Sequence, residues 1–325
     1  MRFAMTEDQQ LFTAAVRELL ADQCPPDRVR AAWDAPADNA LWTQLAQMGV
    51  VGMLAPEAAG GMGMGALDLH PLLIEAGRVA MTEPIVDTSA VAVPLLAAAG
   101  HDAVAGVAAG DQSVAVGFHG DPVVRTDTDL LLLETDGGAW HLLPSSSVET
   151  ADEDSVDGSR RLGRPTWSPS ADTLVGEGLS ADAGNRAIVG VAAQLLGLAR
   201  HLLDETVAYV AVREQFGKPV GSQQAIKHKL ADVLLAIEFA APMVARAAYS
   251  IDQADADVSV HAAMAKAAAG DAAKLAVRHA LQCHGAIAYT VEYDLHMWMK
   301  RVWALDAQWG DARHHRKTIR THLNL

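Results

Sequence analysis

A short polar stretch joins two long apolar-rich segments of the chain, and this junction decides the fold. It reads Arg213-Glu214-Gln215-Phe216-Gly217-Lys218-Pro219-Val220-Gly221-Ser222-Gln223-Gln224. Because Gly217 and Pro219 disfavour helix, we expect one helix to end before them and another to begin after them. The flanking segments then predict two helices of a helical bundle.

The same junction carries candidate ligand-binding groups. We expect Arg213 and Gln224 to lie near the ends of the two helices. A guanidinium suits paired contacts with a pyrophosphate, and helix N-termini favour phosphate oxygens. Gln224 can hydrogen-bond a neutral polar edge of a ligand. On these residues alone, an interhelical turn with a solvated arginine is the simpler interpretation.

The chain on both sides of the junction has a mainly helical pattern. Towards the N-terminus, Thr6 is expected to cap a helix that begins near Glu7, and the apolar run over residues 90–99 predicts a buried helix. Helical patterns return from about residue 181 and continue to the C-terminus. There, apolar residues recur at helical spacing at Ile226, Leu230, Val233, Leu234 and Ile237.

Between about residues 113 and 176 the pattern changes to short apolar runs bounded by turn residues, which is typical of strands and hairpins. Residues 145–170 are polar and rich in Pro, Ser and Asp, so part of them is expected to be loop. We therefore predict a mostly α protein with a small β-domain. The expected parts are an N-terminal helical domain over 1–111, a shortened central β-domain over 112–178, and a C-terminal helical bundle domain over 179–325.

Charge and cysteine content exclude some classes of function. The net charge of −15 repels phosphate backbones and anionic lipids, so neither nucleic acid nor membrane is an expected partner. The two cysteines, Cys24 and Cys283, form no disulfide framework and fit a reducing compartment. Residues 1–8 lack the apolar core of a signal peptide, and no membrane-spanning helix is expected. A cytoplasmic location follows as an expectation.

A second informative stretch runs from Gln282 to Tyr293. Its small residues Gly285, Ala286 and Ala288 let a backbone or a ligand approach closely. Taken alone, Gly285 also suits an ordinary helix C-cap followed by a turn.

Together the two stretches resemble the acyl-CoA dehydrogenase family. The family pattern R-x-x-F-G-x-P-(x)4-Q is complete from Arg213 to Gln224. The pattern Q-x-x-G-G-x-G-(Y/F)-(x)2-E-(Y/H) is partly kept from Gln282 to Tyr293, with alanines at two of its glycines. Residues 56–63 are similar to a third motif, P-E-x-x-G-G-x-G, so the resemblance covers essentially the whole chain in the family's order.

The resemblance implies an activity and a cofactor. The expected fold is an N-terminal helical domain, a central β-domain and a C-terminal four-helix bundle. The expected reaction is FAD-dependent α,β-dehydrogenation of an acyl-CoA, in which a carboxylate takes the α-proton and flavin N5 takes the β-hydride. By the same resemblance, an electron-transfer flavoprotein is the acceptor. The residues expected to contact the ADP end of an FAD bound mainly by a neighbouring subunit are Arg213, Phe216, Gln224, Gln282 and Gly285.

The chain departs from the family at the catalytic base. Trp309 stands where most members carry the catalytic Glu, and Ala187 stands at the alternative position on the long helix. Asp311 is the nearest carboxylate, but two residues along a helix turn it by about 200°, so a cap or an ion pair is favoured over a base. His314 and His315 are also near, and a solvated helix face explains them better.

The central domain departs as well. Two family elements that contact the flavin ring, C-x-(T/S)-E-P-x-A-G-S-D and W-(I/V)-(T/S)-N, are missing between residues 113 and 176. The chain thus resembles the shortened subunits of heteromeric actinobacterial acyl-CoA dehydrogenases that act on steroid side-chain CoA esters. The leading hypothesis is a subunit of such a heterotetramer that relies on a partner chain for the catalytic Glu.

Two alternatives remain open. One is a self-sufficient homo-oligomeric dehydrogenase with a displaced base such as Asp311. The other is a non-catalytic structural or binding subunit on the same scaffold.

Overall fold

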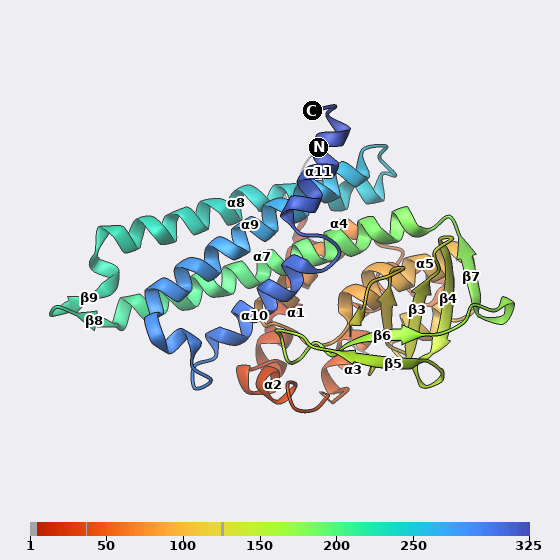
Figure 1. Ribbon diagram of the computed structural model, residues 1–325, viewed down its shortest axis with the longest axis horizontal. Coiled ribbons are helices and arrows are strands. Elements are labelled where there is room, and N and C mark those ends of the chain that lie inside the picture. The colour runs from red at the N-terminus through yellow and green to blue at the C-terminus, as the bar shows by residue number, and fades with distance from the viewer. Residues whose placement is uncertain (1–4, 37, 125–126) are drawn as a thin grey trace.

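The computed structural model describes residues 5–36, 38–124 and 127–325. The first four residues, on which part of the signal-peptide argument rests, lie outside this description. N-terminal helices, a region of strands and a long C-terminal bundle follow one another along the chain (Figure 1). The predicted fold class, mostly α with a small β-domain, is confirmed.

The N-terminal part is a set of helices joined by short turns. They are α1 (Glu7–Gln23), α2 (Pro26–Ala31), α3 (Ala40–Gln47), α4 (Ala66–Arg78), α5 (Val93–Ala99) and α6 (Val104–Ala108). Thr6 caps α1 as predicted: its hydroxyl accepts from the Gln9 N–H at 3.2 Å, and Gln9 Oε1 accepts from the Thr6 N–H at 2.8 Å. The predicted buried helix begins earlier than expected, because a π-helical segment, Val86–Ala92, leads into α5.

The strands form two sheets that pack on each other. A four-stranded sheet has the order β1-β3-β4-β7, with β1 and β3 parallel and the other pairs antiparallel. An antiparallel three-stranded sheet has the order β2-β6-β5. Their bounds are Val114–Gly117 (β1), Val123–Val124 (β2), Leu130–Glu134 (β3), Ala139–Pro144 (β4), Glu149–Glu153 (β5), Leu162–Thr166 (β6) and Leu174–Glu177 (β7). These strands all fall within the predicted central segment of 112–178.

Both faces of the four-stranded sheet are covered, which explains its continuous apolar runs. On β3, Leu130 and Leu132 point into the large core shared with the helices, whereas Leu131 and Leu133 point into a small core between the sheets. The second sheet is more exposed, and its strands β5 and β6 lie in the polar stretch 145–170, where periodicity gave no strand signal.

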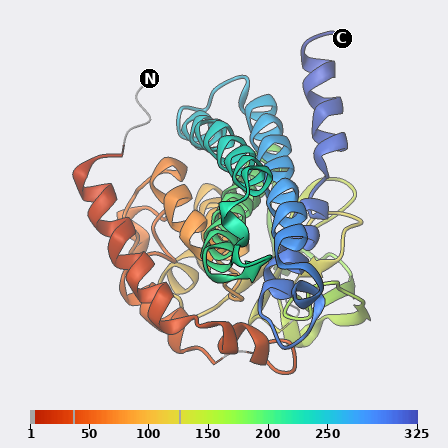
Figure 2. The ribbon, with the colours of Figure 1, turned by 90° about the vertical axis from the view of Figure 1, so that its left-hand side faces the viewer.

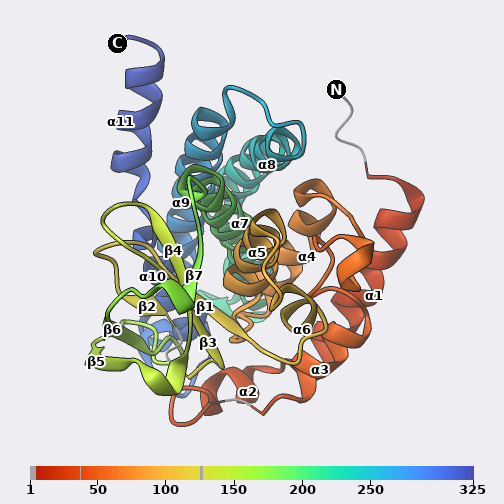
Figure 3. The ribbon, with the colours of Figure 1, turned by 90° about the vertical axis from the view of Figure 1, so that its right-hand side faces the viewer.

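The C-terminal part is a bundle of long helices. They are α7 (Ser180–Val212), α8 (Gln224–Asp252), α9 (Val258–His284), α10 (Leu295–Ala307) and α11 (Ala312–His322). From one end of the bundle, α1 and α11 lie on opposite sides of it (Figure 2). From the other end, most strands lie on one side and α1, α3, α4 and α6 on the other (Figure 3).

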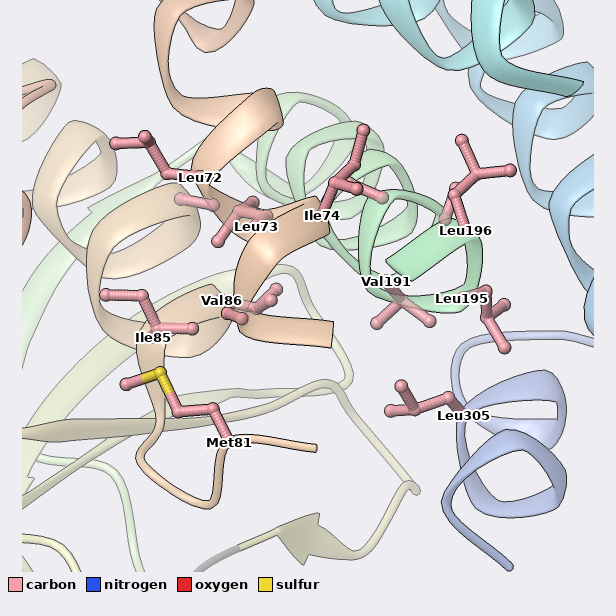
Figure 4. Close-up of a cluster of buried hydrophobic side chains, with 14 of the residues drawn as sticks. Leu72, Leu73, Ile74, Met81, Ile85, Val86, Val191, Leu195, Leu196 and Leu305 are labelled. Atoms are coloured by element: carbon pink, nitrogen blue, oxygen red, sulfur yellow. The ribbon is translucent and has the colours of Figure 1, made fainter. Parts of the chain in front are cut away.

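Helix α7 is the central element of the molecule. It packs on α4, α8 and α9, and Figure 4 shows Val191, Leu195 and Leu196 of α7 near apolar side chains of α4, the segment after it and α10. Among the described residues, α7 is the one helix long and apolar enough to cross a membrane, and 72% of its most apolar window is buried inside the protein.

The junction after α7 is a β-hairpin. Strands β8 (Glu214–Gln215) and β9 (Lys218–Pro219) pair across Phe216 and Gly217, whose φ angles of 55° and 75° fit a tight hairpin turn. Helix α7 therefore ends before Gly217, and α8 begins at Gln224, as the sequence predicted.

Candidate functional site

The main cavity lies between the sheets and the bundle. Its volume is about 670 Å³. Three parts of the chain line it: the loops after β1 and β5, the first turns of α7, and the end of α10 with the turn that follows. Apolar and aromatic walls, including Phe118, Ile188, Trp303 and Trp309, suit a flat ring or an acyl group.

The turn between α10 and α11 places Trp309 in this cavity. Trp309 has φ 54° and Gly310 has φ 98°, and the Trp309 ring packs edge-on against Phe118 with centroids 5.7 Å apart. The resemblance of the sequence predicts that Trp309 stands at the position of the usual catalytic Glu. An indole has no site that accepts a proton near neutral pH, so this position cannot supply the base.

Buried polar groups hold that turn in place. Lys266 is 1% exposed, and its ammonium donates to the carbonyls of Asp306 at 3.0 Å and Gly310 at 2.8 Å. Burial lowers the pKa of Lys266 to about 8. His315 Nε2 lies 3.1 Å from the Trp309 carbonyl, and burial lowers the pKa of this imidazole to about 4. The ring is therefore neutral at pH 7 and donates to that carbonyl.

The other base candidates from the sequence have structural roles or inert chemistry. Ala187 is fully buried in α7. Asp311 caps α11: its carboxylate accepts from the His314 N–H at 2.8 Å, and this bond lowers the pKa of Asp311. Asp311 is not among the residues that line the cavity, whereas the neighbouring His314 is.

Two carboxylates that sequence reasoning missed line the cavity on its strand side. They are Asp121, in the loop after β1, and Asp154, just after β5. Burial raises the pKa of Asp121. No motif marks either residue, so only their place after predicted strands could have drawn attention to them.

A basic group also reaches the cavity. Arg160 Nη2 donates to Gln308 Oε1 at 2.6 Å, and both side chains line the cavity wall. Sequence reasoning missed this pair, because it joins the strand region to α10 across a large sequence distance.

The predicted FAD contacts gather at the far end of the bundle. Arg213, Phe216, Gln224, Gln282 and Gly285 are all exposed, and Phe216 is 92% exposed. The hairpin and the end of α9 lie at the same end of the molecule (Figures 1 and 2).

Stacked aromatic rings join the end of α7 to the end of α9. Tyr209 of α7 stacks on His284 of α9 with centroids 4.2 Å apart. Gly285 ends α9 with φ 68°, so the helix C-cap that the sequence allowed is present beside the other candidate contacts.

The cavity and this cluster cannot serve one cofactor within one chain. Gly184 lines the cavity near the start of α7, and Arg213 follows the end of the same helix. At 1.5 Å per residue, the helix separates them by about 44 Å, which is longer than an extended dinucleotide.

The exposed cluster has groups that fit one end of FAD. Arg213 offers a guanidinium for a diphosphate, Phe216 an exposed ring, Gln224 and Gln282 amides, and Gly285 a position without a side chain. Because they face outward, they suit a cofactor held largely by another chain.

Comparisons with known proteins agree with this architecture. Sequence profiles of the acyl-CoA dehydrogenase N-terminal and C-terminal domains match residues 6–105 and 184–323. The chain is 35% identical over 303 residues to the acyl-CoA dehydrogenase IpdE2 of Mycobacterium tuberculosis, covering 91% of each protein.

Solved structures show the same fold. The ChsE4-ChsE5 complex of Mycobacterium tuberculosis contains a chain with TM-score 0.88 and 22% identity, covering 100% of this chain and 99% of that one. The Tcur3481-Tcur3483 steroid ACAD variant gives TM-score 0.87 and 24% identity, covering 98% of each chain. By its two domain profiles and its full-length relative, the chain belongs to the acyl-CoA dehydrogenase family.

Proposed function

We propose that this chain is the base-less subunit of a heteromeric, FAD-dependent acyl-CoA dehydrogenase. A partner chain supplies the catalytic Glu, and an electron-transfer flavoprotein accepts the electrons. The substrate is an acyl-CoA with a bulky acyl group of the steroid side-chain class, and the complex works in the cytoplasm. FAD, when bound, takes the β-hydride of the acyl group.

The position of Trp309 in the cavity is the main support for this proposal. This residue stands at the family's base position and lines the main cavity, and the turn around it is fixed by Lys266 and His315. A cavity with a rigid indole at that point excludes water and shapes the acyl site, but it takes no proton from the substrate. The proton acceptor must then come from elsewhere.

The exposed apolar face of α8 supports a partner chain. Leu235, Phe239 and Met243 recur at a spacing of four residues and are largely exposed. Contiguous exposed apolar side chains mark interaction surfaces. The two structural relatives are, by their names, a ChsE4-ChsE5 complex and a Tcur3481-Tcur3483 steroid ACAD, which supports unlike partner chains and a steroid-class substrate.

Substitution of Arg213 tests whether the hairpin between α7 and α8 contacts the cofactor. The chain is expressed together with a complete family member, and the flavin retained by the purified complex is measured from its absorbance spectrum. We expect Arg213→Ala to lower retained flavin about tenfold or more, because a charge-assisted diphosphate contact is lost. Arg164→Ala, on exposed strand β6, is the control and should keep full flavin. Equal flavin in both variants would remove Arg213 from the cofactor site.

A self-sufficient dehydrogenase with a displaced base is the second candidate. The observation in its favour is Asp121, which lines the cavity and has a pKa raised by burial. Turnover by the isolated chain that disappears in Asp121→Asn would establish it, and loss in Asp311→Asn instead would identify Asp311 as the base. An isolated chain without turnover, restored by the partner, supports the heteromeric proposal.

A further inference from the structure

A small inner pocket lies next to the main cavity. Its volume is about 40 Å³. Val124, Arg160 and Gln308 line both spaces, so the Arg160–Gln308 hydrogen bond stands between them. A group in the main cavity reaches the inner pocket by passing between these two side chains.

The walls of the inner pocket come from three segments. They are the stretch from Met81 to Asp87, helix α7 through Val191 and Gln194, and helix α10 through Arg301. Figure 4 shows Met81 and Val86 of the first segment and Val191 of α7 within one apolar cluster. The pocket is thus a polar recess inside an otherwise apolar core.

Most polar groups of the recess have protein partners. The pairs are Glu83 with the guanidinium of Arg28 at 2.7 Å, Asp87 with the Val116 N–H at 3.0 Å, Arg301 with Asp157, and Gln308 with Arg160 at 2.6 Å. Because these side chains already have protein partners, they hold the surrounding segments together.

Gln194 is different. It is only 8% exposed, it lines the recess, and its side-chain amide makes no hydrogen bond with any residue in the described part of the chain. Because this amide lines the recess and has no hydrogen bond to the protein, it is available to pair with a polar group of a ligand.

We propose that Gln194 determines specificity by hydrogen-bonding a neutral hydroxyl or ketone oxygen at the far end of the acyl group. The inference rests on the proposed function, in which the main cavity holds an acyl-CoA. The substrates are then thioesters oxygenated at that end rather than plain fatty acyl-CoAs.

Charge and size favour a neutral oxygen. The carboxylates of Glu83 and Asp87 and the guanidiniums of Arg160 and Arg301 all line the recess, so their formal charges balance, and the Gln194 amide adds no charge to hold an ionised end group. A volume of about 40 Å³ holds a small polar group, since one water needs roughly 10–15 Å³ of such space.

The test uses the chain in complex with its partner. Parent acyl-CoAs from hexanoyl to hexadecanoyl, and the same series with a terminal hydroxyl, are titrated by calorimetry without an electron acceptor. We expect the hydroxylated thioester to bind about tenfold more tightly than its parent at one or two chain lengths, where the oxygen reaches Gln194. Equal affinity across the whole series would overturn the inference.

Variants assign the preference to Gln194. Gln194→Met should remove the hydroxyl preference while keeping the affinity for the parent thioesters, whereas the exposed control Gln253→Met should keep both. The ligand-free Gln194→Met protein should melt no lower than wild type, because the substitution removes an unpaired amide. A preference that survives in Gln194→Met would overturn the assignment.

The outcomes separate the two proposals. If the complex binds and turns over parent and hydroxylated thioesters equally well, only the role of Gln194 is disproved. A complex that binds none of these thioesters overturns the role of Gln194, and one that also binds no steroid side-chain CoA ester contradicts the proposed function itself.

Discussion

Lys266 holds the turn that places Trp309 in the cavity. Its ammonium is buried and bridges two carbonyls at the end of α10, where the chain turns through Trp309 and Gly310. No sequence motif points to this lysine, because its partners are carbonyls some forty residues away along the chain. The sequence located the Trp309 position, and only the three-dimensional arrangement explains why it is rigid.

Lys266→Met should destabilise the protein by about 1–3 kcal/mol, because two buried carbonyls lose their donor. The free energy of unfolding from urea titration measures this loss. Lys227→Met, at an exposed lysine of α8, should change it by less than about 0.5 kcal/mol. Equal losses in the two variants would show that the bridge adds no stability of its own.

Buried histidines make stability depend on pH. Burial lowers the pKa of His70, His201 and His315 to about 4 in the folded chain. In the unfolded chain these groups protonate near pH 6.5, so their contribution is fully present above that pH and is lost as the pH falls towards 4. The urea midpoint should therefore drop steadily between pH 7 and pH 5.

His201→Phe should make that drop smaller. The His201 ring stacks on Trp298 with centroids 4.2 Å apart, and phenylalanine can keep the stack without titrating. An unchanged slope of stability against pH in this variant would show that His201 does not contribute to the acid sensitivity.

At the scale of elements, sequence patterns predicted the long helices and the hairpin junction but not the finer pieces. Gly217, Pro219 and the apolar periodicity fix where α7 ends and α8 begins. Strands β5 and β6 carry polar residues on an exposed sheet, so no alternation marked them. The recess at Gln194 depends on how the segment 81–87, α7 and α10 pack, which no local pattern contains.

The contact between α4 and α7 depends on glycine. A Cβ on Gly197 would lie 1.9 Å from the Ile74 carbonyl oxygen, so the helices would have to separate. Gly197→Ala should cost about 1–3 kcal/mol or more, measured by urea unfolding. Gly184→Ala, in the same helix with its nearest neighbour 3.9 Å away, should be neutral or slightly stabilising. A Gly197→Ala protein as stable as wild type would contradict the tight contact.

At the scale of the whole molecule, two exposed surfaces are available for contact with a second chain. They are the apolar face of α8 and the Arg213 cluster at the end of the bundle. The motif residues of that cluster were readable from the sequence, and their exposure leaves them open to a second chain. The single-chain fold therefore supports an assembly in which the cofactor site is shared.

Phe239→Asp should weaken that assembly. Phe239 is 70% exposed on α8, and a carboxylate there disfavours burial against a partner. Light scattering of the co-expressed proteins should show dissociation, together with loss of flavin. Leu11→Asp, which changes a comparably exposed leucine on α1, should leave the complex intact. An intact complex with Phe239→Asp would exclude this face as the interface.

The ratio of flavin to protein tests the central claim most directly. The chain is purified alone and together with a complete family member, and FAD is quantified against each chain. A shared site predicts almost no flavin on the isolated chain and one FAD for each pair of unlike chains in the complex. One FAD bound by every isolated chain would contradict the shared site.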